Sequence, residues 1–122
     1  MDLVDKIYYS LKEATPKEMK IKYLLRPETF PCISYHKFND TPIFWGDGNA
    51  RRSMKSFQID IWDKTNMLVV SRYADKVITS LKKEGFILSR KSESYEDNIK
   101  CYRMAIVFNY YDKEEEDEQE SI

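Results

Sequence analysis

The sequence predicts an α+β fold in which two helices cover one face of an antiparallel four-stranded sheet, in the order α-β-β-α-β-β. Apolar residues recur at helical spacing in two stretches, and four other stretches alternate apolar with polar residues or are rich in aromatic and β-branched ones. The chain has 122 residues, of which 42% are hydrophobic, enough for one core. Layered packing of helices on a sheet buries such elements, so we expect a single domain over residues 1–111.

The first half of the chain predicts one helix and two strands. Asp2 can cap a helix that ends before Pro16, because proline cannot continue it. The apolar face of this helix carries Leu3, Val4, Ile7, Leu11 and Ala14. Residues 17–26 show no clear pattern. Residues 32–38, C-I-S-Y-H-K-F, have the composition of a strand, and residues 56–62, S-F-Q-I-D-I-W, alternate as a half-buried strand does.

The second half predicts one helix and two further strands. Thr65 or Asn66 can cap the helix, and Gly85 is a typical stop. Its apolar face carries Val70, Ala74, Val77, Ile78 and Leu81. A strand over residues 86–91 and a polar turn over residues 93–98 follow. The last strand is expected to end at Tyr111 and to place on one face Tyr102, Met104, Ile106, Phe108 and Tyr110.

The predicted sheet has a second face that no helix covers. This face would carry Trp62, with Tyr35 or Tyr111, where a monomer usually keeps polar residues. Large aromatic side chains there indicate a subunit interface, although singly exposed apolar residues are also normal. Both interpretations remain open.

Charge is distributed unevenly along the chain. Residues 112–122, D-K-E-E-E-D-E-Q-E-S-I, contain seven acidic residues and one lysine. Subtracting them from the chain's 21 acidic and 20 basic residues leaves residues 1–111 with 14 and 19, a net charge of +5. An acidic run repels itself, so we expect a disordered, solubilising tail, with binding to a basic partner as the alternative. No stretch has the apolar pattern of a membrane span or signal peptide, which predicts a soluble intracellular protein.

The predicted loop over residues 41–52, T-P-I-F-W-G-D-G-N-A-R-R, looks most like an active site. Its Gly46-Asp47-Gly48 lacks the third glycine and helix of a dinucleotide site and the Gly-Lys-Ser/Thr of a P-loop. These glycines are better interpreted as turn residues. A connection of this length between strands is typical of a binding loop, so we expect it to contact another protein.

Other polar residues form no catalytic or metal-binding pattern. His36 is the only histidine, and a strand histidine without an indicated partner is usually structural. Asp60 and Asp63 lack the further carboxylates and the lysine of a metal-dependent nuclease. Cys32 and Cys101 are isolated and are expected to be buried thiols. The sequence therefore predicts no enzyme activity, no cofactor and no metal site.

Nucleic-acid binding is the alternative function. Arg51-Arg52, Lys82-Lys83 and Arg90-Lys91 could neutralise phosphates, and an aromatic-rich sheet could stack bases. The basic residues are scattered among acidic ones, however, and the acidic tail would compete with phosphate. A solvated surface of mixed charge is therefore favoured.

Two strand segments carry a resemblance to a known family. Residues 30–42, F-P-C-I-S-Y-H-K-F-N-D-T-P, and residues 56–62, followed by an amphipathic helix and Gly85-Phe86, resemble the small tail-terminator or tail-completion proteins of long-tailed bacteriophages and prophages. The resemblance covers residues 2–111 and rests on the order of elements and on the P-C-I-x-Y and Q-I-D-I-W strands. The acidic tail and the A-R-R-S-M-K segment are not features of it.

The resemblance implies a structural role without enzyme activity or cofactor. Such proteins assemble as a ring, commonly hexameric, on the end of the tail tube, stop its polymerisation and present a surface to the head connector. The implied partners are further copies of the chain, the tail-tube protein and the head-completion protein, with DNA passing through the ring and no membrane. The implied location is the bacterial cytoplasm during assembly and then the virion or phage-like particle. Our candidate interface residues are Phe44, Trp45, Asp47, Arg51, Arg52 and Trp62.

Overall fold

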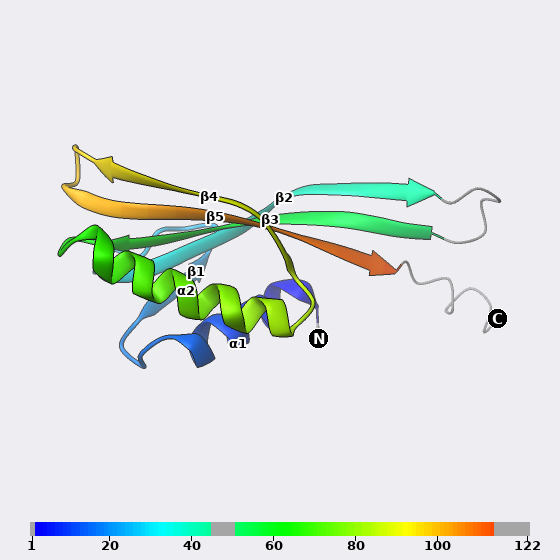
Figure 1. Cartoon of the computed structure of the whole chain (residues 1–122), viewed down its shortest axis with the longest axis horizontal. Coiled ribbons are helices and arrows are strands. Elements are labelled where there is room, and N and C mark those ends of the chain that lie inside the picture. Colours follow the sequence, from blue (N-terminus) through cyan, green and yellow to red (C-terminus); the bar gives the residue numbers. More distant parts are fainter. Residues whose placement is uncertain (1, 45–50, 114–122) are drawn as a thin grey trace.

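The computed structural model describes residues 2–44 and 51–113, which form two helices and a five-stranded sheet. In chain order the elements are α1 (Leu3–Ala14), β1 (Lys20–Tyr23), β2 (Cys32–Phe44), β3 (Arg51–Asp63), α2 (Met67–Lys83), β4 (Ile87–Glu96) and β5 (Cys101–Lys113). The strands lie in the order β1-β2-β3-β5-β4. Both helices lie on one face of the sheet (Figure 1).

The predicted four-stranded antiparallel sheet is wrong, because a fifth strand makes the sheet mixed. β1 pairs with β2 in parallel, from Lys20 opposite Cys32 to Tyr23 opposite Tyr35, whereas the other three pairings are antiparallel. β1 has only four residues, which alternate between exposed and half-buried side chains. A short edge strand with two exposed lysines buries too little apolar surface to leave a clear pattern in the sequence.

Capping residues fix the ends of both helices as the sequence predicts. The Asp2 side chain accepts a hydrogen bond from the Asp5 backbone N–H at 2.9 Å. Of the two candidate caps of α2, Asn66 is the one that caps the helix: its side chain accepts a hydrogen bond from the Val69 backbone N–H at 3.0 Å. Gly85, at a backbone φ of +93°, ends α2 in the left-handed region that favours glycine.

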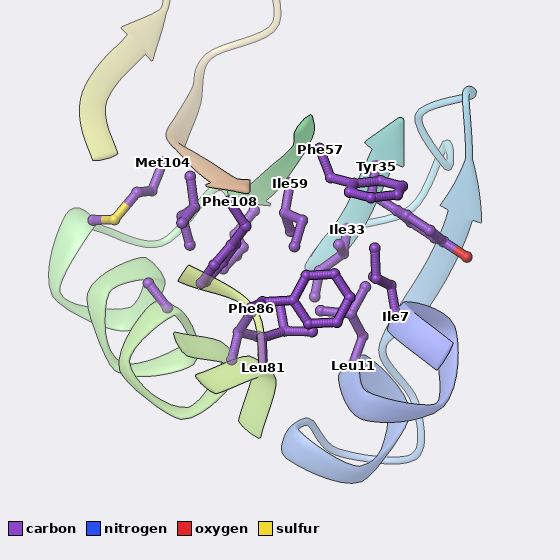
Figure 2. Close-up of a cluster of buried hydrophobic side chains, with 14 of the residues drawn as sticks. Ile7, Leu11, Ile33, Tyr35, Phe57, Ile59, Leu81, Phe86, Met104 and Phe108 are labelled. Carbon is purple, nitrogen blue, oxygen red and sulfur yellow. The ribbon is translucent and has the colours of Figure 1, made fainter. Parts of the chain in front are cut away.

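The hydrophobic core lies between the helices and the inner strands. Figure 2 shows Ile7 and Leu11 of α1 meeting strand residues, with Phe86 among them. Tyr35 also belongs to this core, because it is only 2% exposed and its hydroxyl donates to the Val4 carbonyl at 3.1 Å. The expectation that Tyr35 could lie on the open face was therefore wrong.

Two predicted loops are partly strand. β2 runs to Phe44 and β3 starts at Arg51, so Thr41 to Phe44 pair with Met54 to Arg51 where a long loop was expected. Likewise β4 runs to Glu96 through the predicted polar turn, and the chain turns at residues 97–100. The described side chains of residues 41–43 and 93–96 are exposed or half-buried, so neither segment shows the buried alternation of a core strand.

The sheet carries two bulges at the same level. Phe38 is an extra residue in β2 between Lys37, opposite Phe57, and Asn39, opposite Ser56. Ser89 is the extra residue in β4, and both bulges adjoin the row of cross-strand partners Lys37, Phe57, Phe108 and Leu88. Bulges bend a strand and increase its twist. Beyond this row, β2, β3 and β5 continue past the helices as an arm, formed by residues 39–44, 51–56 and 109–113 (Figure 1).

Candidate protein-interaction surfaces

The open face of the arm carries a small apolar patch beside an arginine. Met54 lies opposite both Thr41 and Tyr111, and Arg52 lies opposite Ile43. Met54 and Ile43 are half-buried, Tyr111 is 41% exposed and Arg52 is exposed. Tyrosine, methionine and arginine are enriched at the centres of protein interfaces. We call Ile43, Arg52, Met54 and Tyr111 the arm patch.

The other face of the arm is held by a charge network. The Lys55 ammonium lies 3.3 Å from an Asp40 carboxylate oxygen and 3.7 Å from one of Asp112, and Lys37 lies 3.2 Å from Asp40. Lys37, Lys55 and Asp112 border a groove of ≈ 450 Å³ that the start of α1 completes. Such exposed ion pairs contribute little free energy each, but they join the arm's three strands. Asp112, which we had expected to begin the tail, lies in β5.

A second surface surrounds Trp62, at the other end of β3. Two guanidinium groups lie over the Trp62 ring, with the Cζ of Arg103 at 4.8 Å and that of Arg26 at 5.4 Å from its centroid. Its indole N–H donates to the Ser34 hydroxyl at 3.2 Å, and Arg103 binds the buried Asp60 through Nε at 3.0 Å and Nη2 at 2.9 Å. Cation–π contacts of this kind fix the ring in place. We call Arg26, Trp62 and Arg103 the tryptophan cluster.

This arrangement bears on the nucleic-acid alternative. A sheet that stacks bases needs aromatic faces open to the base, and Arg26 and Arg103 both lie over the Trp62 ring. The Arg103 guanidinium is also engaged by Asp60. Two arginine side chains therefore lie over the Trp62 ring, where a stacked base would have to lie.

The predicted interface residues fall in two separate places. Trp45 and Asp47, like the rest of the Gly-Asp-Gly stretch, lie outside the described residues. The backbones of Phe44 and Arg51 pair at the end of the arm, next to Arg52. Trp62 lies ten residues along β3 from Arg52, which is about 34 Å at ~3.4 Å per residue. The predicted loop residues and the predicted open-face residue Trp62 therefore lie on two separate surfaces.

The remaining candidates for chemistry have structural partners. The His36 ring lies 6.2 Å from that of Phe38 on the exposed side of β2. Asp63 accepts a hydrogen bond from the Thr65 N–H at 3.2 Å, just before α2. Cys32 and Cys101 are free, buried thiols, as predicted. Burial raises the pKa of Cys32 to about 12 and also raises that of Cys101, so neither is a thiolate nucleophile at neutral pH.

Residues 2–44 and 51–113 contain neither a metal-binding cluster nor a helix that could span a membrane. Within these ranges no three His, Cys, Asp or Glu side chains converge as metal ligands would. Neither helix in the described part of the chain has the length and apolar character needed to cross a membrane.

Comparison with known proteins gives one kind of match. The sequence matches no protein-family model and no curated protein. The fold is similar to that of a chain from the virion of a native gene transfer agent particle. The two superpose with a TM-score of 0.62 at 9% sequence identity, over 88% of this chain and 92% of that one. At such low identity the likeness shows a shared fold.

Sequence reasoning missed the arm patch and the role of Arg26. Ile43 and Met54 lay in the predicted loop and its approach, so their alternation with exposed residues was not read as a strand. Tyr111 had been noted as a possible open-face aromatic, and it is exposed there. Arg26 lies in the patternless segment before β2, where only the folded chain brings it over Trp62.

Proposed function

We propose that this chain is a structural subunit of a phage or phage-like particle, which caps the tail tube as a ring and joins the tail to the head without catalysis. The observation that carries the proposal is the similarity to a chain of a gene transfer agent virion, which extends over nearly the full length of both chains. The sequence resemblance to tail-terminator and tail-completion proteins supports the same role.

The two candidate surfaces fit a ring. A closed ring is built from heterologous contacts, in which one patch of each copy meets a different patch of the next. The arm patch and the tryptophan cluster differ in composition and lie near opposite ends of β3. Each offers large side chains with arginine, the combination that concentrates binding free energy at interfaces.

The experiment deletes the gene for this protein from the phage or prophage that encodes it. We expect a phage or prophage that lacks this gene to produce tails of uncontrolled length that are not joined to heads, because nothing stops tube growth. Electron microscopy of induced lysates measures tail length, and a plasmid copy of the gene should restore it. Purified protein should also form rings. Tails of normal length joined to heads, or a chain that stays monomeric at high concentration, would contradict the proposal.

A further inference from the structure

A basic groove lies beside the tryptophan cluster. It has a volume of ≈ 390 Å³ and is bordered by the connection from β1 to β2, by the residue after β3 and by the turn from β4 to β5. Its basic lining residues are Arg26, Lys64 and Lys100. The Arg26 guanidinium lies 5.3 Å and the Lys64 ammonium 5.0 Å from the centroid of the Phe30 ring. Phe30 thus holds two cations at one rim of the groove.

The groove carries a surplus of positive charge. Glu28 is the one acidic side chain among its lining residues, against three basic ones. Arg26, Lys64 and Lys100 are exposed, and within residues 2–44 and 51–113 none of them forms an ion pair with a carboxylate. Three cations around a groove that also presents the Phe30 ring match a peptide that carries several carboxylates.

The chain itself contains such a peptide. Residues 114–120, E-E-E-D-E-Q-E, hold six carboxylates and directly follow β5. β5 begins next to the groove, at Cys101, and ends at Lys113 at the far end of the molecule (Figure 1). At ~3.4 Å per residue, the thirteen residues of β5 span about 40 Å. Seven extended residues reach at most about 25 Å, so the acidic segment cannot return to its own groove.

We propose that the acidic segment of one copy binds the basic groove of the next copy. The proposal rests on the ring assembly proposed above and specifies one of its contacts. The segment leaves from the arm and the groove adjoins the tryptophan cluster, so one neighbour receives both the arm patch and the acidic segment. The contact therefore runs in one direction around the ring, as heterologous assembly requires. Its charge pairs set register and partner choice more than affinity.

The test measures peptide binding directly on the full-length chain. The receptor is a variant in which the six carboxylates become amides, E114Q/E115Q/E116Q/D117N/E118Q/E120Q, so that it cannot supply its own ligand. A fluorescent peptide of residues 112–122 is titrated with this receptor by anisotropy at low salt. We then add K64Q/K100N to the groove, with asparagine at position 100 because the backbone there has a φ of +51°. The matched control, K82Q/K83Q, removes two lysines from the last turn of α2.

We expect K64Q/K100N to weaken peptide binding roughly tenfold and K82Q/K83Q to leave it within about twofold, because only the first pair contacts the peptide. Equal losses in both variants, or no binding by the receptor, would overturn the proposal. Tighter binding of a DNA oligonucleotide, lost in K64Q/K100N, would overturn it in favour of a nucleic-acid site. Thermal unfolding midpoints confirm that all variants fold.

Ring formation by the unaltered chain is measured separately by electron microscopy. Rings without peptide binding would overturn this contact and leave the proposed function standing. Peptide binding without rings would overturn the ring and retain the groove as an acidic-peptide site.

Discussion

Gly85 illustrates how single residues with a local physical role can be predicted from the sequence. It lies just after α2 with a φ of +93°, where its N–H donates to the Lys82 carbonyl and the next N–H, of Phe86, donates to that of Leu81. This pair of bonds is a Schellman motif, which satisfies the last carbonyls of the helix. Asp2 and Asn66 act equally locally at the helix starts. Each role depends on neighbours in the chain, so the sequence alone reveals it.

We expect Gly85→Ala to lower the free energy of unfolding by about 1–2 kcal/mol, because an L side chain is disfavoured in the left-handed region. A Cβ there would lie 3.6 Å from Cε2 of Tyr110, an ordinary contact, so no steric clash adds to the loss. Urea unfolding measures the change. Gly85→Asn should cost less, since asparagine tolerates positive φ. Unchanged stability in the alanine variant would contradict this explanation.

At the scale of elements, a strand could be predicted where every second side chain is apolar and buried. β3 was recognised because Phe57, Ile59 and Ile61 are all fully buried on one face. β1 was not, because it has only four residues and its inward side chains are only half-buried, and the outer part of β4 was not, because nearly all its side chains are exposed. The bulge at Phe38 hid the rest of β2, since one extra residue shifts the alternation that follows it.

Deletion of Phe38 should remove this bulge at small cost, below about 1 kcal/mol. Phe38 is 48% exposed and has no cross-strand partner, so Asn39 can still pair with Ser56. Deletion of Ser34, two places from Cys32 in the same strand, is the control. It should cost several kcal/mol because it turns Ile33, which is fully buried, toward the wrong face. Equal losses of unfolding free energy would show that Phe38 is not the extra residue.

For the whole molecule, the sequence led to part of the candidate site. Trp62 was identified from the alternation of residues 56–62, and Arg52 as a basic residue of the predicted loop. The gathering of Arg26 and Arg103 over Trp62 depends on pairings between distant segments, whereas the separation of Arg52 and Trp62 follows from their spacing in one strand. The parallel position of β1 and the connection after it set where Arg26 lies, and nothing in the sequence pattern indicated either.

The double variant Met54→Ser/Tyr111→Ser should abolish ring assembly while the monomer stays folded. Both side chains lie on the arm, outside the core, so unfolding free energy should change by less than about 1 kcal/mol. Sedimentation velocity reports the assembly state. Tyr9→Ser/Leu68→Ser is the control, because both residues are 59% exposed on the helices and lie outside the arm. Rings that persist in the first variant, or equal loss in both, would exclude the arm patch as the contact.

One strand, β3, runs through both candidate surfaces, from Arg52 in the arm patch to Trp62 in the tryptophan cluster. In a closed ring, the angle between a subunit's two contacts determines how many copies complete the circle. In the proposed ring, this angle follows from the twist of the sheet that contains β3, to which the bulges in β2 and β4 add. The copy number of the proposed ring therefore depends on the curvature of the sheet. Inserting or removing a bulged residue is a direct means of changing it.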